Sequence, residues 1–203
     1  MDTMLSDEDG QRAVRYARRV IARHVRGDEI PDLDADEPFT ARAGVFVTLN
    51  RHPSGDLRGC IGIPEPSMQL AAALREAATS ATRDPRFPPL QAEELDDVTV
   101  EVTVLTPPEK IEVDNPRSYP SCIRVGRDGL IAERQGRRGL LLPQVPVAQG
   151  WDAETFVSQT CWKAGLPHDA WLNEDTRLYR FQGEVYRETE PHGDVVRETL
   201  DDD

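Results

Sequence analysis

The sequence LRGCIG, residues Leu57–Gly62, is the most informative segment of this chain. In an extended strand, alternate side chains point to opposite faces. Arg58 and Cys60 are therefore expected to share one face, with their Cα atoms on the order of 7 Å apart. A thiol beside a fixed positive charge has its thiolate favoured, which lowers its pKa below the free value of ~8.5. If solvent reaches the site, the charge should lower the pKa of Cys60. If the thiol is buried, desolvation should raise it instead.

Two interpretations of this strand follow from the residues alone. In the first, Cys60 is a catalytic thiol and Arg58 and Gly59 bind a ligand, since two glycines within four residues let a ligand or another backbone come close. A nucleophile also needs a base or an oxyanion site, and the sequence identifies neither. In the second, Cys60 packs as a small hydrophobic residue, while Arg58 pairs with a carboxylate such as that of Glu101 on a neighbouring strand.

Hydrophobic periodicity on both sides of this segment predicts alternating helices and strands. Valine alternates with polar residues from Val98 to Val104, which is the pattern of a half-buried strand. The elements expected along the chain are, in order, a helix from Ser6 to Gly27, strands at 43–50 and 57–63, a helix at 68–82, a strand at 98–104, a meander of three strands at 123–126, 130–134 and 139–142, a helix that Asp152 caps, and a strand at 176–187.

This order of elements predicts an α+β fold, with a mixed or mostly antiparallel sheet and flanking helices, rather than a doubly wound fold. At 203 residues the chain is long enough to bury a substantial core. The meander and the helix after it can contribute a second, smaller lobe, with a cleft between the two lobes. Residues 188–203 end in three aspartates and are expected to be a frayed acidic tail.

Two polar segments outside LRGCIG supply further candidate ligand-binding residues. Pro85 keeps Asp84 out of the helical region, so a turn forms here that can hold Asp84 and Arg86 at the rim of a cleft. The alternative is a structural Asx turn in which Arg86 pairs locally. Gln144 lies at a strand-to-helix junction, where its amide can either bind a ligand or serve as a satisfied structural group. Glu101 is expected to be a solvated charge or an ion-pair partner rather than a general base.

Other stretches accompany the LRGCIG strand along the chain. They are GVFVTL at 44–49, SATRDPRFPPL at 80–90, GLLLPQV at 139–145, GWD at 150–152 and CWKAGL at 161–166. In this order and spacing they resemble the AMMECR domain family. The resemblance implies a single AMMECR-type domain at residues 1–187, with its core at 10–187 and an acidic C-terminal tail at 188–203.

The resemblance also implies partners. Bacterial and archaeal members of the family look associated by gene neighbourhood with a Memo-like protein and a radical S-adenosylmethionine enzyme, which are therefore the expected partners. Radical chemistry within this chain is not expected, because its three cysteines lack the CxxxCxxC spacing of a cluster site. The sequence points to no particular cofactor.

Two classes of function are consistent with the sequence and the resemblance. The first is a cytoplasmic enzyme, or a component of one, that acts on a small anionic metabolite or a modified nucleotide in a cleft. That cleft would be lined by Arg58, Gly59, Cys60, Asp84, Arg86 and Gln144. The second is a non-catalytic binding or scaffold module that presents the LRGCIG strand to a protein partner. An accessible thiol of low pKa favours the first class, and a buried, inert thiol favours the second.

The composition is acidic and poor in lysine. The net charge is −13 at pH 7, and Lys110 and Lys163 are the only lysines. This balance resembles proteins of salt-loving archaea and predicts a halophilic source with an acidic surface. No stripe of Lys and Arg interleaved with aromatic residues occurs, so nucleic acid is not the favoured partner.

The sequence also predicts the compartment and excludes some sites. The acidic N-terminus lacks the features of a signal peptide, and no apolar run approaches the ~18 residues of a membrane helix. An odd number of cysteines without paired spacing is typical of reduced thiols in a cytoplasm. The four histidines lack the HxxxH and HxH spacings of metal ligands, so no metal site is predicted.

Overall fold

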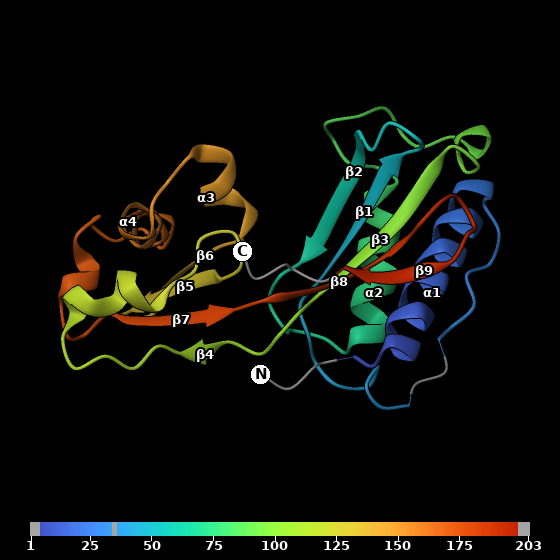
Figure 1. Ribbon diagram of the computed structural model, residues 1–203. Coiled ribbons are helices and arrows are strands. Elements are labelled where there is room, and N and C mark those ends of the chain that lie inside the picture. The colour runs from blue at the N-terminus through green and yellow to red at the C-terminus, as the bar shows by residue number, and fades with distance from the viewer. Residues whose placement is uncertain (1–4, 34–35, 199–203) are drawn as a thin grey trace. The chain divides into compact units, whose positions relative to one another are not determined.

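The computed structural model describes residues 5–33 and 36–198, and Figure 1 shows its helices and strands. The chain forms two compact units, one of Met1–Thr106 with Gly183–Asp203 and the other of Pro107–Gln182. Strands pair antiparallel in both units, and helices accompany each sheet, so the predicted α+β class is confirmed. The single domain at 1–187 and the cleft stay predictions. None of the described helices has the length and apolarity that a membrane span requires.

The first unit is built on a five-stranded sheet with the strand order β2-β1-β3-β8-β9. Its strands are β1 (Val45–Arg51), β2 (Leu57–Ile63), β3 (Val98–Leu105), β8 (Gly183–Glu188) and β9 (Val195–Glu198). β3 occupies the centre because its alternating valines give the sheet one fully buried apolar face. The LRGCIG strand, β2, lies at one edge, so one side of its backbone has no neighbouring strand in this sheet.

Two helices, α1 (Asp7–Arg26) and α2 (Leu70–Ala81), pack against the valine face of this sheet (Figure 1). The predicted capping of α1 is confirmed, since the Ser6 side chain accepts a hydrogen bond from the backbone N–H of Asp9. Gly27 ends the helix in the left-handed conformation. The buried face of the sheet is therefore formed mainly by the apolar side chains of β1 and β3, and β2 also packs against α2 on this face.

The structure corrects two expectations near the C-terminus. The single strand predicted at 176–187 is wrong, because β7 (Arg177–Phe181) and β8 belong to different sheets and are separated at Gln182. The frayed tail is also wrong in part, since β9 pairs with β8 and closes the far edge of the first sheet. Both corrections have one cause. A local hydrophobic pattern predicts that a segment is a strand, but it does not predict which distant strand that segment pairs with. Residues 199–203 lie outside the described part of the chain.

The second unit has a four-stranded sheet with the order β4-β7-β5-β6. Its elements are β4 (Glu109–Lys110), η2 (Pro116–Cys122), β5 (Gly129–Arg134), β6 (Arg137–Leu141), α3 (Gln144–Gln149), α4 (Ala153–Lys163), η3 (Ala170–Leu172) and β7. Asp152 caps α4 as predicted, by accepting from the N–H of Thr155. The strand predicted at 123–126 is wrong, because this segment leaves η2 and enters a turn in which Gly126 has a φ of 89°.

The second unit is inserted between two neighbouring strands of the first. β3 ends at Leu105 and β8 begins at Gly183, and these two residues are paired in the sheet. Within the second unit, Lys110 of β4 pairs with Tyr179 of β7. The two ends of the inserted segment are therefore adjacent in both units. The pairing of β3 with β8 holds them together in the first unit, and the pairing of β4 with β7 does so in the second.

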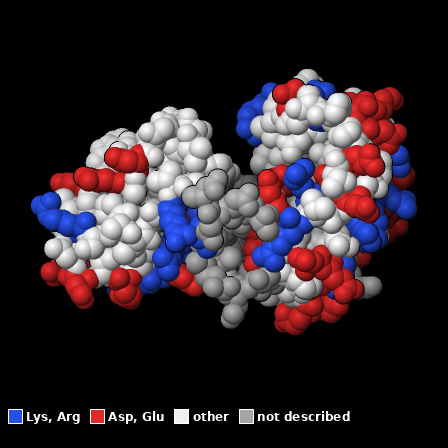
Figure 2. All heavy atoms as spheres, in the orientation of Figure 1, with Lys and Arg blue, Asp and Glu red and all other residues white. Residues whose placement is uncertain are grey.

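Charged side chains of both signs lie close together on each unit in the view of Figure 2. Many arginines of the described residues form ion pairs with carboxylates, for example Arg75 with Asp32 in the first unit and Arg138 with Glu133 in the second. The excess of acidic residues in the sequence thus coexists with local ion pairing of the arginines.

Candidate functional site

Arg58 is turned away from the position that simple strand alternation predicts. The pairing of β1 with β2 shifts register between Leu49 and Asn50, which pair with Gly59 and Leu57, so Arg58 is the extra residue of a β-bulge. Its side chain is buried, and Nε and an Nη donate to the two carboxylate oxygens of Glu94, both at 2.8 Å.

The prediction that Arg58 acts on Cys60 is therefore wrong. The pairing of Arg58 with Glu101 is also wrong, since its carboxylate partner is Glu94 of η1 (Ala92–Glu94). A bulge re-aims side chains, and this one directs the guanidinium of Arg58 to Glu94, with the ring of Phe87 5.9 Å away. The positive charge that acts on the Cys60 thiol belongs to Arg86 instead.

Cys60 lies in a row of polar side chains that crosses three strands. It pairs with Thr48 of β1, and Thr48 pairs in turn with Glu101 of β3. The hydroxyl of Thr48 donates to Sγ of Cys60 at 3.2 Å. The row lies on the face away from α2, because the neighbouring Gly59 faces the carbonyl of Ala81 at the end of that helix.

Asp84 and Arg86 close the outer edge of β2 at Cys60. The buried carboxylate of Asp84 accepts from the backbone N–H of Cys60 at 2.8 Å, and an Nη of Arg86 donates to the carbonyl of Cys60 at 3.2 Å. Since the only N–H of Cys60 is used in this way, Cys60 and Thr48 form a non-hydrogen-bonded pair, the kind in which side chains come closest.

The geometry around Asp84 includes the predicted Asx turn. One carboxylate oxygen of Asp84 accepts a hydrogen bond from the backbone N–H of Arg86. The guanidinium of Arg86 also donates to both carboxylate oxygens of Asp84. Asp84 is thus saturated with hydrogen bonds and is 1% exposed, whereas the side chain of Arg86 is 56% exposed. The arrangement makes Asp84 a positioning residue and leaves part of the Arg86 guanidinium facing solvent beside Cys60.

The two glycines of the signature are explained by packing. A Cβ on Gly59 would lie 2.5 Å from the carbonyl oxygen of Ala81, so the glycine lets α2 approach β2. A Cβ on Gly62 would lie 2.2 Å from the ring of Phe46, which covers that position. A ligand contact at Gly59 stays a prediction.

Burial and charge determine the protonation of the site. Burial raises the pKa of the Cys60 thiol, although the hydrogen bond from Thr48 and the charge of Arg86 oppose the rise. Burial likewise raises the pKa of Glu101, so of the two expected roles the solvated charge is wrong; its register partner on β8 is Arg187, whose charge opposes the rise. In contrast, the Arg86 guanidinium holds the pKa of Asp84 well below its usual range. The free protein therefore presents a protonated thiol, a carboxyl whose pKa burial raises, and a fixed cation.

Sequence analysis missed Thr48 and did not predict that Glu101 is partly buried. The signal that could have identified both is the strand register, because the three strands of the row lie far apart in the chain and only their pairing brings the side chains together. Gln144 lies exposed at the start of α3, in the second unit, and its membership of this site stays a prediction. The same holds for the catalytic role of Cys60. The described residues contain no group of three His, Cys, Asp or Glu placed to hold a metal ion.

The thiol chemistry of Cys60 should respond to its neighbours in a defined way. We expect Glu101→Gln to speed alkylation of Cys60 by iodoacetamide at pH 7, because it removes a charge that raises the pKa of the thiol. Thr48→Val and Arg86→Gln should slow it, since each removes an influence that lowers that pKa. A change of one pKa unit alters the thiolate fraction about tenfold. Peptide mass spectrometry reads the rates residue by residue.

Cys161 serves as the internal reference in this experiment. It is fully buried in the second unit, burial raises its pKa to about 11, and it should stay unlabelled until the protein unfolds. Should Cys60 behave like Cys161 in every variant, Cys60 is a packing residue and not a reactive one.

Comparisons with known proteins place these residues in a wider group. The AMMECR1 family model matches residues 14–186. The chain is 52% identical over 198 residues to the protein MJ0810 of Methanocaldococcus jannaschii, covering 97% of this chain and 98% of that one. It is 56% identical over 188 residues to a protein of Methanothermobacter thermautotrophicus, covering 91% and 96%. The crystal structure of the uncharacterised protein PH0010 from Pyrococcus horikoshii matches with a TM-score of 0.79 at 50% identity, covering 98% of this chain and 100% of that one.

Proposed function

The chain belongs to the AMMECR1 family, and on that premise we propose that it is a cytoplasmic enzyme, or a component of one, that binds a small anionic metabolite or a modified nucleotide beside Cys60. The observation that carries the proposal is the guanidinium of Arg86. Buried Asp84 holds it in place, its outer part is exposed, and it lies against the backbone of Cys60. A fixed, partly exposed guanidinium beside a row of polar side chains is suited to carboxylate or phosphate groups.

The raised pKa of the Cys60 thiol counts toward the scaffold class by the criterion of thiol reactivity, so the enzyme proposal rests on Arg86 and not on a reactive thiol. A protonated Cys60 adds no negative charge that would repel an anion, and burial raises the pKa of Glu101, which favours its protonated form more than in water. Thr48 lies between the two in the row and donates to the sulfur. In this proposal Arg86 binds the anionic group, Glu101 acts as the acid or base, and Cys60 contacts the ligand.

The test is a thermal-shift screen of anionic compounds: inorganic phosphate, pyrophosphate, sugar phosphates, nucleoside monophosphates and dicarboxylates. A ligand present at about 100 times its Kd stabilises the protein by ~2.7 kcal/mol, which is readily detected. We expect at least one compound to stabilise the wild-type protein and to lose about tenfold or more in affinity with Arg86→Gln. Glutamine is chosen because its amide can still donate to Asp84.

The matched control is Arg75→Gln, which removes a partly exposed arginine of the same unit that is also paired with one aspartate. The control should bind the compound as the wild type does. If every stabilising compound binds Arg86→Gln and the wild type equally well, or if none binds the wild type, the anion site is refuted.

The second candidate, a scaffold that presents β2 to a protein partner, is favoured by one observation. β2 is an edge strand, and edge strands accept the strands of partners. At Cys60, however, the outward N–H and C=O are already bonded to Asp84 and Arg86, which blocks strand addition there. A partner of this kind would have to use the side chains of β2 instead.

Three further assignments rest on composition and resemblance. The partners we propose are a Memo-like protein and a radical S-adenosylmethionine enzyme. Lysine poverty and a net charge of −13 support a halophilic source with an acidic surface. The odd, unpaired cysteines support a reducing cytoplasm.

A further inference from the structure

A groove lies within the first unit, and none of the residues around Cys60 lines it. It is an open groove of about 510 Å³ between α1 and the turn that joins β8 to β9. This volume falls within the range of small-molecule sites. Every residue that lines it belongs to the first unit, so its geometry depends on that unit alone.

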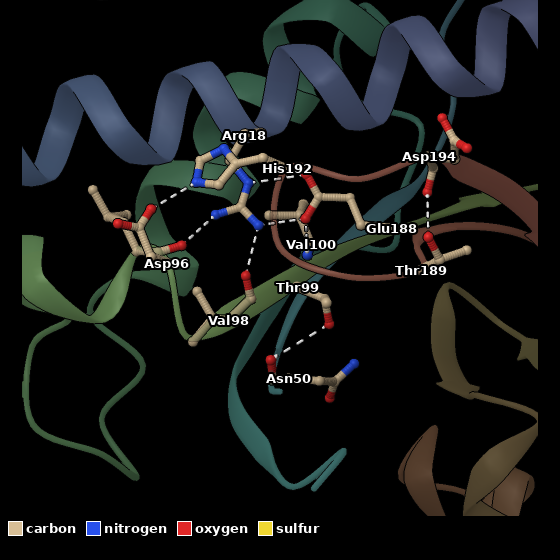
Figure 3. A network of polar contacts seen from close by, with 11 residues as sticks. Arg18, Asn50, Asp96, Val98, Thr99, Val100, Glu188, Thr189, His192 and Asp194 are labelled. Carbon is tan, nitrogen blue, oxygen red and sulfur yellow. Dashed lines mark hydrogen bonds and ion pairs between the residues drawn. The ribbon is translucent and has the colours of Figure 1, made fainter. Parts of the chain in front are cut away.

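The floor of the groove is a buried ion pair, shown in Figure 3. Arg18 of α1 donates through Nε and an Nη to the carboxylate of Glu188 at the end of β8, and both side chains are less than 10% exposed. The remaining donors of Arg18 reach the carbonyls of Leu95 at 2.9 Å and Val98 at 2.6 Å. Glu188 also accepts from the N–H of Val100. This floor is electrically neutral and satisfied, so it offers a ligand no strong partner.

The wall on α1 is cationic. Arg15 and Arg19 stand one helical turn apart, and both are exposed. Among the described residues neither forms an ion pair; Arg19 lies 5.9 Å from the ring of Tyr16. Side chains at i and i+4 are neighbours on a helix, so the two guanidinium groups can converge on one carboxylate.

The opposite wall, on the turn between β8 and β9, is anionic. Glu190 and Asp194 line it, and neither carboxylate pairs with a cation within the described ranges. Opposite charges thus face one another across the groove without pairing. A ligand that carries a cation and an anion at its two ends matches this division, whereas a phosphate dianion would be repelled by the acidic wall and an amine by the basic one.

The anionic wall is held in place by an unusual residue. The N–H of Gly193 donates to the carbonyl of Glu190, which closes a turn whose third residue, His192, has a φ of 62°. That position normally favours glycine, and a side chain there strains the backbone by about 1 kcal/mol or more. The imidazole Nε2 lies 2.9 Å from a carboxylate oxygen of Asp96, just before β3, as Figure 3 shows. His192 therefore fixes the turn, and with it the width of the groove.

From this arrangement we propose that the groove binds a small zwitterion of the class of free α-amino acids. The carboxylate of the ligand lies between Arg15 and Arg19, and its ammonium group faces Glu190 and Asp194. The buried pair of Arg18 and Glu188 supports both walls from below. The inference is independent of the anion site at Cys60.

The experiment uses the full chain and the twenty protein amino acids, each added at up to 20 mM to ¹⁵N-labelled protein. We expect at least one to shift the amide resonances of His192 and Gly193 in a saturable manner. Its carboxylate-only and amine-only analogues, which lack the ammonium or the carboxylate, should each bind about tenfold more weakly or worse. A double variant, Arg15→Gln with Arg19→Gln, should lose binding by at least about tenfold.

The matched control removes two arginines of the same helix outside the groove, Arg23→Gln with Arg26→Gln, and should bind as the wild type does. The proposal is overturned if no amino acid shifts these resonances, which would mean that the two walls pair with each other in solution. It is equally overturned if the carboxylate-only analogue binds as tightly as the amino acid, since the site would then recognise an anion alone.

Discussion

Replacing Arg18 with methionine is expected to lower the free energy of unfolding by about 3–5 kcal/mol. The substitution leaves the carboxylate of Glu188, 4% exposed, without its cation, and removes the donors that satisfy the carbonyls of Leu95 and Val98. Breaking one side of a buried pair is far more harmful than losing a surface one, because the remaining charge stays desolvated.

Urea denaturation followed by far-ultraviolet circular dichroism measures this effect. The three tryptophans all lie in the second unit, so their fluorescence does not report on the first. The control is Arg19→Met, an exposed position on the same helix, where we expect a change within about 0.5 kcal/mol. Adding Glu188→Gln to Arg18→Met should recover part of the loss, since the amide keeps an acceptor for Val100 without a buried charge. A loss below about 1 kcal/mol for Arg18→Met would refute the argument.

Replacing Asp84 with asparagine is expected to destabilise the protein by about 2–3 kcal/mol at neutral pH. The substitution weakens the bonds from the N–H of Cys60 and from the backbone and side chain of Arg86. The destabilisation should be smaller than the loss of about 3–5 kcal/mol for a fully buried ion pair, because the outer edge of the Arg86 guanidinium is in solvent.

The pH dependence of stability is a second test of the stabilising role of the Asp84 carboxylate. The pKa of Asp84 is lower in the folded protein than in the unfolded chain, so its contribution is fully present above the unfolded value of ~3.9. That contribution is lost as the pH falls through this region toward the folded value. Wild-type stability should therefore decline from about pH 5 to pH 2, and Asp84→Asn should flatten the decline.

Glu94 contributes to the slope that remains in the variant, because the hydrogen bond from Arg58 lowers its pKa; Asp36 and Asp152, whose pKa values are also lowered by hydrogen bonds, contribute as well. Glu93→Gln, an exposed position without an ion pair among the described residues, is the control and should leave the acid slope unchanged. Parallel acid curves for Asp84→Asn and the wild type would contradict the assignment.

The fold class could be predicted because it depends on local signals. Ser6 and Gly27 mark the ends of α1, Asp152 marks the start of α4, and the valine alternation marks β3. Each of these acts within a few residues and leaves a pattern in the sequence. Strand pairing acts over long separations, which is why the break at Gln182 and the pairing of β9 were not predicted.

The candidate site was predicted in composition but not in arrangement. Cys60, Asp84 and Arg86 do come together in the first unit. One extra residue in β2 reverses the direction of Arg58, and no propensity signals a bulge between Leu49 and Asn50. The exchange of Arg58 for Arg86 as the charge near the thiol follows from that single irregularity.

The insertion of the second unit between β3 and β8 has a consequence for how the chain folds. Pairing Leu105 with Gly183 across an unstructured insertion carries a loop-closure entropy that grows by about 0.6 kcal/mol with each doubling of loop length. Once β4 has paired with β7, Lys110 and Tyr179 are already adjacent, and the loop left for the first sheet to close is only a few residues long. The converse holds if the first sheet forms earlier. Folding of either unit therefore brings together the two chain segments that the other unit has to pair. The central strand pairing of the first sheet then requires the closure of only a short loop, although the paired strands lie far apart in the sequence.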